Sequence, residues 1–527
     1  MSTNAIDSFL DYKANTPSQC GNYQIDIPKL KEGEQYRFHF DMTACVGCHC
    51  CEVACNEQNG NSAEIKWRRV GEMEVGSFPE TMQLFNSMSC NHCLEPACLI
   101  GCPTESYIKL ENGIVQHNQD TCIGCQYCTW NCPYEVPVFN PEQGVVSKCH
   151  MCVDKLEAGQ TPACIQACPA GAISIEVVNK DEWIKSDLAK EGVAPHLPDP
   201  NITKPTTRYT LPELPEGEII PADKHHLAPA HPEFPLVFMT ILTQMSFGGL
   251  VAILLGEILS GFGLNLPAPN FATVFAIFLA SAIGLPLSAL HLGRPILAMS
   301  AMKNYKTSWL SREAIALGAF TAILMLLAGV FYFGGSKSLK ILLEILALGI
   351  GGYGIYAQSM IYRVPARPAW NRPSTTFRFF GSGYLGFLLV ATVVSGYSTQ
   401  AVPAILALVM LTALYQLYLI LAEIFFYKYL SEDTPNFYQL NRSKTLLEKH
   451  FGGLRKIRII SLGFFGVAMP LFGVVLAVAG LESLTFWVLA LALLGAFGSE
   501  LIGRFLFYST VVPTGLAGNF FAGNQRG

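Results

Sequence analysis

Residues 122–133 read CIGCQYCTWNCP, in which four cysteines have the spacing C-x2-C-x2-C-x3-C and a proline follows the last. Three thiolates this close in sequence can bind three irons of one [4Fe-4S] cubane, whereas the fourth, one helical turn further on, reaches the second cluster of a pair. The proline then ends the local run and turns the chain away. The spacing therefore predicts an iron-sulfur module whose clusters come in pairs.

Three further cysteine groups extend this pattern. Residues 45–55 have the same spacing, residues 90–102 read C-x2-C-x4-C-x3-C, and residues 149–168 read C-x2-C-x11-C-x3-C. Four groups predict four [4Fe-4S] clusters in an α+β double module of the bacterial ferredoxin-like type. Its short strands are expected in GIVQHN (113–118) and GAISIEVV (171–178). We expect sixteen of the eighteen cysteines to bind iron: Cys45, Cys48, Cys51, Cys55, Cys90, Cys93, Cys98, Cys102, Cys122, Cys125, Cys128, Cys132, Cys149, Cys152, Cys164 and Cys168.

Structural zinc is the alternative for cysteines in C-x2-C pairs. A zinc site needs two such pairs and not four-cysteine runs that end in Cys-Pro, so the pattern favours iron. The remaining Cys20 and Cys50 are expected to be non-ligands. His49, His92 and His150 stand next to cluster cysteines, where hydrogen bonds to sulfur would tune the potential. A partly exposed loop position is the simpler expectation for each histidine.

Composition divides the chain into a cysteine-rich part and an apolar part. All eighteen cysteines precede residue 169, whereas apolar runs of membrane length begin only after Pro235. The net charge of −5 indicates no basic surface for phosphate, so nucleic acid is not an expected partner. We expect a leader (1–35), a four-cluster electron-transfer domain (36–178), a Pro-rich linker (179–235), a membrane anchor (236–510) and a tail (511–527).

The first residues contain no charged n-region, no apolar h-region and no Arg-Arg pair, which predicts neither a secretory nor a twin-arginine signal. The linker holds ten prolines and the pair His225 and His226 without a helical period. Such a composition is typical of an extended, solvated strap.

Eight apolar segments are each long enough to span a hydrocarbon core of roughly 30 Å, which predicts an all-α transmembrane bundle. The even count returns both ends of the bundle to one side. Small-residue patches, SFGG (246–249) and GIGGYG (349–354), indicate close contact between helices. The expected spans are 236–262, 270–292, 312–334, 340–362, 379–398, 402–427, 458–480 and 484–509.

Histidine is scarce in the membrane half, which has only His291 and His450. A di-haem anchor needs four axial histidines, so the sequence predicts no haem and leaves quinone as the lipid-soluble electron carrier. ALHLGRP places His291 and Arg294 at the end of the second helix, and SWLSREA places Glu313 at the start of the third. We predict a quinone site at this trio, because it offers a hydrogen-bond donor and proton-exchanging groups at one membrane surface. A polar clamp without a ligand is the alternative.

Other charged residues of the apolar segments lie away from that trio. Glu500 and Arg504, spaced i to i+4, are expected to form a structural ion pair. Glu257, Glu344 and Glu423 have no partner evident in the sequence, and they stay candidates for a proton path.

Over nearly its whole length the sequence resembles the iron-sulfur subunit of the DMSO reductase family joined to that family's membrane anchor. The first half is similar in YRFHFDMTACVGCHCCEVAC, SMSCNHCLEPACLIGCP, CIGCQYCTWNCPY and KCHMCVDKL, and the anchor in EFPLVFMTILTQ, SALHLGRPILAMSAM, SWLSREA and GSELIGRFLFY. These two subunits are usually separate proteins. The resemblance implies a partner subunit that holds a molybdenum bis-pyranopterin cofactor, for which this chain offers no residues.

The resemblance also implies roles for single residues. His291 and Glu313 align with positions that the family uses for menaquinol. The first cysteine group is expected to exchange its fourth ligand with the fourth group, and the second with the third. Cys168 would then complete the cluster of the first group, Cys55 that of the fourth, Cys132 that of the second and Cys102 that of the third. Cys125 stands where nitrate reductase relatives have an aromatic residue, which implies a full cluster there.

Charge in the loops predicts the orientation of the chain. Loops 293–312, 363–378 and 428–458 and the tail, all on the side of the amino terminus, hold sixteen Lys or Arg against two on the other side. The positive-inside rule then places the iron-sulfur domain in the cytoplasm. This orientation narrowly favours a sulfite:quinone oxidoreductase-type complex over an anaerobic reductase of DMSO and other S- or N-oxides.

Two functions of other classes are weaker. A membrane-bound iron-sulfur sensor would need a labile cluster and an output domain, and a hydrolase would need a nucleophile elbow, a phosphate loop or an open-site histidine motif. The sequence shows none of these features. It therefore favours an electron-transfer subunit without catalytic residues of its own.

Overall fold

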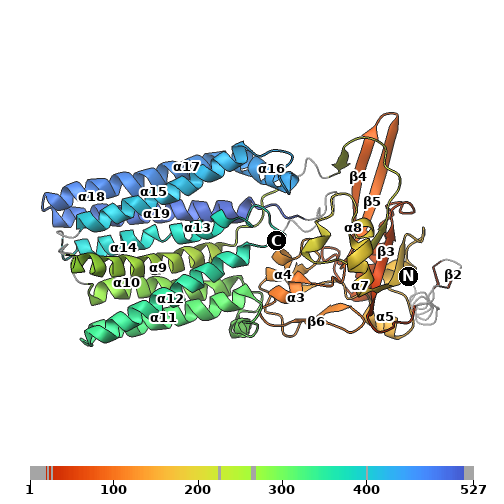
Figure 1. The fold of residues 1–527 in the computed structure, drawn as a ribbon, viewed down its shortest axis with the longest axis horizontal. Coiled ribbons are helices and arrows are strands. Elements are labelled where there is room, and N and C mark those ends of the chain that lie inside the picture. The colour runs from red at the N-terminus through yellow and green to blue at the C-terminus, as the bar shows by residue number, and fades with distance from the viewer. Residues whose placement is uncertain are drawn as a thin grey trace, which may run out of the picture. The chain divides into compact units, whose positions relative to one another are not determined.

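The computed structural model describes residues 19–20, 23–24, 28–222, 227–262, 269–398 and 402–514 (Figure 1). The chain forms two compact units, residues 1–227 with 514–527 and residues 228–513. The first unit holds every cysteine group, and the second holds every apolar segment that the sequence predicts to span a membrane.

Two three-stranded sheets form the frame of the first unit. In one, β3 (Glu34–Asp41) pairs antiparallel with β10 (Ile173–Asn179) and parallel with β11 (Arg208–Thr210). In the other, β4 (Arg69–Ser77) and β5 (Glu80–Met88) form a long hairpin, visible in Figure 1, and β12 (Ile219–Pro221) pairs with β4. The remaining strands form two-stranded ladders: β1 (Gln19–Cys20) with β2 (Tyr23–Gln24), β6 (Tyr107–Lys109) with β7 (Val115–His117), and β8 (Val138–Asn140) with β9 (Val145–Ser147).

Each cysteine group leads into a short helix. The third and fourth cysteines of every group are four residues apart, so about one turn of helix carries the chain from one sulfur to the next. The strands predicted in GIVQHN and GAISIEVV are present as β7 and β10. The fold is thus the ferredoxin-like α+β module that the sequence predicts. Its helices are α2 (Cys50–Asn59), α3 (Ala97–Gly101), α4 (Tyr127–Asn131), α5 (Val153–Glu157), α6 (Ala163–Gln166), α7 (Lys180–Glu182), η1 (Trp183–Asp187), α8 (Leu188–Glu191) and η2 (Pro200–Ile202).

The extended strap predicted for residues 179–235 is wrong for part of that range. Residues 180–191 are helical, and β11 and β12 complete the two sheets. Trp183 is buried and its indole N–H donates to the Pro205 carbonyl at 2.9 Å, while Arg208 pairs with Glu176 at 3.3 Å. Prolines are tolerated because they stand where no N–H is needed, as Pro200 does at the start of η2. His225 and His226 lie outside the described residues.

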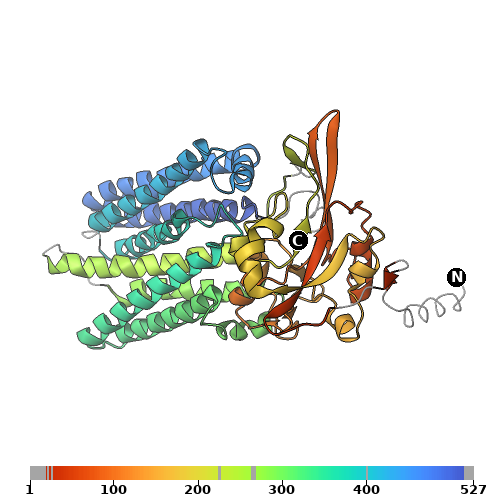
Figure 2. The ribbon, with the colours of Figure 1, turned by 45° about the vertical axis from the view of Figure 1, so that its right-hand side comes forward.

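The second unit is all helical, and eight of its described helices are long and apolar enough to cross a membrane. Their ends differ from the predicted spans by a few residues. The helices lie side by side in both ribbon views (Figure 1, Figure 2). The spans are α9 (Phe234–Gly261), α10 (Phe271–Leu287) with η3 (Ser288–His291), α11 (Trp309–Tyr332), α12 (Lys337–Tyr362), α13 (Pro373–Gly381) with α14 (Tyr384–Ser395), α15 (Val402–Lys428), α17 (Gly452–Gly463) with η6 (Phe464–Ala468) and α18 (Met469–Val478), and α19 (Glu482–Ser509).

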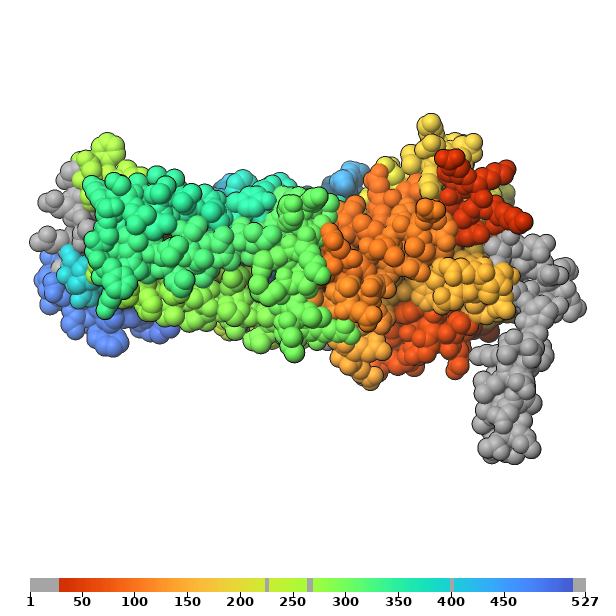
Figure 3. All heavy atoms as spheres, turned by 90° about the horizontal axis from the view of Figure 1, so that it is seen from below, coloured from red at the N-terminus to blue at the C-terminus, as the bar shows by residue number. Residues whose placement is uncertain are grey.

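Three shorter helices lie in the connections between these spans. They are η4 (Pro295–Met302), α16 (Phe437–Thr445) and η5 (Leu446–His450). Figure 3 shows one face of this unit, formed largely by the green segments that include α11 and α12. Leucine, isoleucine and methionine side chains are exposed along both helices, for example Met325, Leu342 and Ile345. Such a surface matches lipid and not water, as expected of a multi-pass membrane protein.

Glycines let the spans approach closely where the sequence predicts it. A Cβ atom on Gly248 of α9 would lie 1.9 Å from the carbonyl oxygen of Gly383, and one on Gly386 would lie 2.1 Å from the Gly249 nitrogen. In α12, a Cβ atom on Gly351 would lie 2.6 Å from the Phe320 ring of α11. Any larger residue at these positions would push the helices apart.

Candidate cluster sites and membrane site

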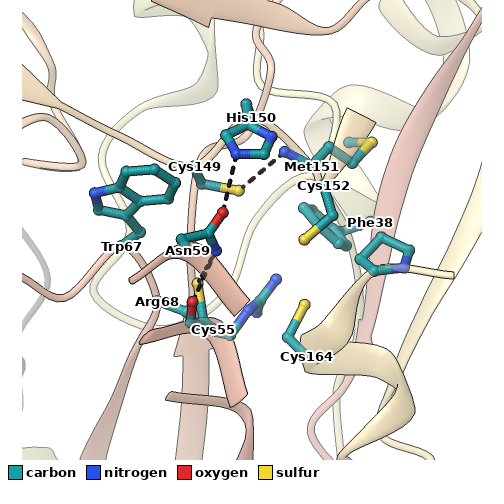
Figure 4. Close-up of a pocket in the computed structure, with 11 residues that line it drawn as sticks. Phe38, Cys55, Asn59, Trp67, Arg68, Cys149, His150, Met151, Cys152 and Cys164 are labelled. Carbon is teal, nitrogen blue, oxygen red and sulfur yellow. Dashed lines mark hydrogen bonds between the residues drawn. The ribbon is translucent and has the colours of Figure 1, made fainter. Parts of the chain in front are cut away.

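One cavity of the first unit is lined by four cysteines. Cys55 comes from the first group, and Cys149, Cys152 and Cys164 come from the fourth. Their sulfur atoms point into the same space (Figure 4), which Trp67 and other apolar side chains help to enclose. Three sulfurs from one group and one from another is the arrangement that the family resemblance implies for this set.

The other twelve of the sixteen predicted ligands fall into three more sets of the same kind. A second cavity is lined by Cys45, Cys48, Cys51 and Cys168, and a third by Cys90, Cys93, Cys98 and Cys132. The last set is a group of mutual neighbours, Cys102, Cys122, Cys125 and Cys128. In each set, three cysteines of one group meet the fourth cysteine of its partner group.

The donors around these sulfurs suit bound thiolates. Backbone N–H groups of Ser106, Gly124 and Met151 each lie 3.4 Å from a cysteine sulfur. The Asn59 amide donates to Cys55 Sγ at 3.7 Å, and the Ser87 hydroxyl lies 3.3 Å from Cys51 Sγ. Hydrogen bonds of this kind stabilise the negative charge of an iron-sulfur cluster and set its potential. The four sets therefore fit [4Fe-4S] clusters by the number of their sulfurs and by the hydrogen bonds to them.

A buried arginine adds positive charge between two of the sets. Arg68 is 2% exposed, and its guanidinium donates to Ser87 and Ser89. Burial lowers the pKa of Arg68, but the neighbouring Cys164 and Cys51 thiolates raise it above the ordinary value. Burial also raises the pKa of Cys51 to about 11, so a thiolate at this position needs such compensation.

The three histidines beside the cysteines were each expected at a partly exposed loop position, and one of them differs. His92 is fully buried, and its Nδ1 accepts a hydrogen bond from the Val115 N–H at 3.0 Å, so the expected partial exposure is wrong there. His150 is half-buried in the cavity of Figure 4 and bonds to Asn59 at 3.0 Å. Cys50 is exposed and belongs to none of the four sets, and the side chain of Cys20 lies outside the described residues.

His291 and Glu313 lie at the same end of the second unit, where α10 ends and its neighbour α11 begins. The His291 Nδ1–H donates to the Ser288 carbonyl, which leaves the Nε2 lone pair to accept a hydrogen bond. Arg294 is half-buried just before η4. Both His291 and Glu313 are described, and no hydrogen bond joins them. The trio is gathered at one end of the bundle but is not one bonded cluster.

Glu313 turns instead toward α12 and α19. Its side chain is 8% exposed and lies near Gln358. The phenols of Tyr362 and Tyr508 are its neighbours, and their oxygens lie 2.5 Å apart. The carboxylate therefore lies in a small polar pocket inside an otherwise apolar bundle.

The ion pair predicted between Glu500 and Arg504 is wrong. Glu500 accepts from Ser382 at 2.9 Å and has its cation in Arg458 at 4.0 Å, whereas Arg504 reaches away to Gln244 of α9. Two buried residues one turn apart can each find a partner on a different neighbouring helix, which spacing along one helix does not reveal.

The three carboxylates that the sequence offers as candidates for a proton path divide into two cases. Glu423, for which the sequence shows no evident partner, forms a two-pronged ion pair with Arg378 of α13. Glu257 of α9 and Glu344 of α12 lie side by side, and Glu344 is fully buried. A proton path through these residues stays a prediction.

A cysteine-rich ferredoxin-like unit followed by an eight-helix membrane unit defines a membrane-anchored iron-sulfur electron-transfer protein. The model of the DMSO reductase anchor subunit (DmsC) family matches residues 228–510, and that of the 4Fe-4S dicluster domain matches residues 81–178. The anchor match covers more than half of the chain. The chain therefore belongs to the DMSO reductase anchor subunit family and carries that family's iron-sulfur subunit in the same polypeptide, as the resemblance predicts.

Relatives of known name match the iron-sulfur part. The B subunit of the anaerobic dimethyl sulfoxide reductase of Haemophilus influenzae is 36% identical over 181 residues, which are 33% of this chain and 87% of the relative. Its Escherichia coli counterpart is 37% identical over 179 residues, 32% of this chain and 86% of the relative. The formate dehydrogenase-O iron-sulfur subunit of Escherichia coli is 37% identical over 194 residues, 33% of this chain and 62% of the relative.

Proposed function

We propose that this chain relays electrons between the quinone pool and a separate catalytic subunit that holds a molybdenum cofactor, through four [4Fe-4S] clusters and without haem. The observation that carries the proposal is the sorting of sixteen cysteines into four sets, each with one cysteine from the partner group. The names of the relatives, a reductase B subunit and a formate dehydrogenase iron-sulfur subunit, support such a partner.

The membrane unit supplies the other end of the relay. Quinone gains or loses protons together with its electrons, whereas the clusters carry electrons alone, so a site must exchange protons where the two meet. His291 offers a free Nε2 that can accept a hydrogen bond from a quinol hydroxyl, and Glu313 offers a buried carboxylate at the same end of the bundle. Arg294 lies on the same loop and completes the proposed quinone site.

Quinone should reoxidise the reduced clusters if this relay exists. The complex, purified with its catalytic subunit under anaerobic conditions, is reduced with dithionite and then mixed with a soluble quinone while cluster EPR signals are followed. We expect the signals of reduced clusters to disappear with quinone as they do with ferricyanide. Reoxidation by ferricyanide but not by quinone would contradict the proposal that the chain exchanges electrons with quinone.

Two complexes are candidates for the whole assembly. The names of the relatives support a reductase of DMSO or related S- or N-oxides that oxidises menaquinol. The charge bias of the loops supports a cytoplasm-facing complex of the sulfite:quinone oxidoreductase type. Substrate assays on the purified complex separate them, because sulfite would reduce the clusters and DMSO would reoxidise them.

The orientation of the chain follows from its loops. We propose that the iron-sulfur domain and the carboxy terminus face the cytoplasm, because sixteen Lys or Arg lie on that side against two on the other. Fusions of a fluorescent reporter and of a periplasmic phosphatase after Gly527 test this. Fluorescence without phosphatase activity is expected, and phosphatase activity alone would reverse the orientation and favour the S- or N-oxide reductase.

A further inference from the structure

One lysine is buried in the iron-sulfur unit beside a cysteine-lined cavity. Lys148 is 3% exposed and lines the cavity of Cys90, Cys93, Cys98 and Cys132, which we call the Cys90 cavity. Among the described residues that line this cavity, Lys148 is the one with a positively charged side chain, and the lining side chains other than the cysteines are neutral. A positive charge therefore borders the site of the proposed cluster.

Two backbone carbonyls hold the Lys148 ammonium in place. Its Nζ donates to the carbonyl of Val115, a residue that also lines the Cys90 cavity, and to the carbonyl of Cys149 at 2.9 Å. Val115 is itself fixed, because its N–H donates to the buried His92 ring at 3.0 Å. Among the described residues, no carboxylate forms an ion pair with Lys148. A buried cation costs much free energy unless a negative charge compensates it.

The cysteine sulfurs of the cavity are the groups that can supply this negative charge. Burial raises the pKa of the Cys90 thiol, and the charge of Lys148 opposes that rise. Attraction between charges in a buried site is screened less than in water. A [4Fe-4S] cluster bound by these sulfurs becomes more negative each time it is reduced, and nearby charge changes its potential. Lys148 would therefore favour the reduced cluster over the oxidised one.

A neighbouring cavity has a different buried cation. Cys149 follows Lys148 in the chain, but its sulfur points into the cavity of the fourth group (Figure 4). That cavity is lined by Arg68, whereas the Cys90 cavity is lined by Lys148. Because each of the two cavities has its own cation, replacing Lys148 should act mainly on one cluster.

We propose that Lys148 sets the reduction potential of the cluster held by Cys90, Cys93, Cys98 and Cys132, and that its positive charge raises this potential. The inference rests on the proposed function, because it requires the cluster. Lys148 forms and breaks no bond during electron transfer, and the electron resides on the cluster. A cluster of raised potential accepts an electron more readily and releases it less readily, so Lys148 affects both steps of the relay.

A redox titration followed by EPR tests the role of Lys148. The complex, purified anaerobically with its catalytic subunit, is poised at a series of potentials, and the signal of this cluster is the one that Cys93→Ser removes or changes. In Lys148→Met the ratio of reduced to oxidised cluster at a given potential should fall about tenfold, which is a midpoint potential lower by about 59 mV for one electron. Lys148→Arg keeps the charge and should move the potential much less.

Lys155→Met is a matched control, because it removes the same charge from a half-buried lysine that bonds to Gln160 and lines none of the three cavities. It should leave the potential of this cluster in place. If Lys148→Met fails to assemble the cluster, Lys148→Gln decides the matter, since its amide can still donate to a carbonyl.

The outcomes separate this inference from the electron relay itself. An unchanged potential in an assembled Lys148→Met or Lys148→Gln variant refutes the role of Lys148 and leaves the relay intact. Absence of this cluster from the unaltered complex, shown by iron analysis and EPR, would refute the four-cluster relay and the inference about Lys148 together.

Discussion

Replacing His291 by leucine is expected to lower quinone-coupled turnover by about a hundredfold or more, because positioned acid-base groups contribute roughly 10²–10⁴ to a rate. The His291 Nε2 is the ring nitrogen left to accept a hydrogen bond from quinol, since Nδ1 is bonded to Ser288. Glu313→Gln, which keeps the shape and removes the proton acceptor, should have a similar effect. Steady-state oxidation of a soluble quinol by the purified complex measures both.

His450 provides a matched control for this experiment. It is the other histidine of the membrane half, and it is exposed in η5 and not at the end of α10. His450→Leu should leave turnover unchanged, and all variants should keep clusters that artificial donors reduce. Normal quinol turnover in both the His291 and the Glu313 variant would mean that these residues form a structural clamp and that quinone binds elsewhere.

Cys55→Ser should remove the cluster of the fourth cysteine group and leave the cluster of the first group intact. Cys55 lies in sequence beside Cys45, Cys48 and Cys51, but its sulfur lines the cavity of the fourth group. The variant should therefore lose about four irons, those held by Cys149, Cys152 and Cys164, or retain a three-iron form there. EPR of the isolated complex identifies which cluster changes.

Cys50→Ser is the control for the loss of a thiol in the same helix. Cys50 is exposed and outside all four sets, so this variant should keep every cluster. If Cys55→Ser instead removed the cluster of Cys45, Cys48 and Cys51, ligation would be local to each group. The exchange of ligands between the first and fourth groups would then be wrong.

The features that could be predicted from sequence are those set by local chemistry. Cysteine spacing follows from the geometry of a cubane, and the length of an apolar run follows from the thickness of a membrane. Both signals are contained in short stretches such as 122–133 or 309–332. The ferredoxin-like unit and the eight helices of the described residues are accordingly predictable with small errors at their ends.

The features that sequence reasoning missed depend on distant partners. The segment after Asn179 reads as a strap because its prolines are frequent, but Trp183 and Arg208 find partners in Pro205 and Glu176. Arg68 lies in no motif, and only folding brings it between Cys51 and Cys164. A positively charged residue inside a cysteine-rich unit could have indicated that its charge compensates thiolates. The sequence does not say which thiolates lie beside it.

The polar contacts of the membrane unit also depend on residues that are distant in the sequence. The motifs of the sequence bring His291 and Glu313 to one end of the bundle, as the structure does. Gln244, Gln358 and Arg504 lie on three other helices, and their spacing along the chain carries no sign of the bonds between them. Polar residues in apolar spans could have been noted as a group, because such residues are rarely left without a partner.

Iron and acid-labile sulfide per chain give the most direct measurement of the proposed electron relay. Four [4Fe-4S] clusters require about sixteen iron atoms and about as many sulfides in anaerobically purified protein. Elemental analysis should find that number with little zinc. Eight irons or fewer, with zinc in their place, would contradict the assignment of sixteen cysteines to four clusters and the electron relay built on it.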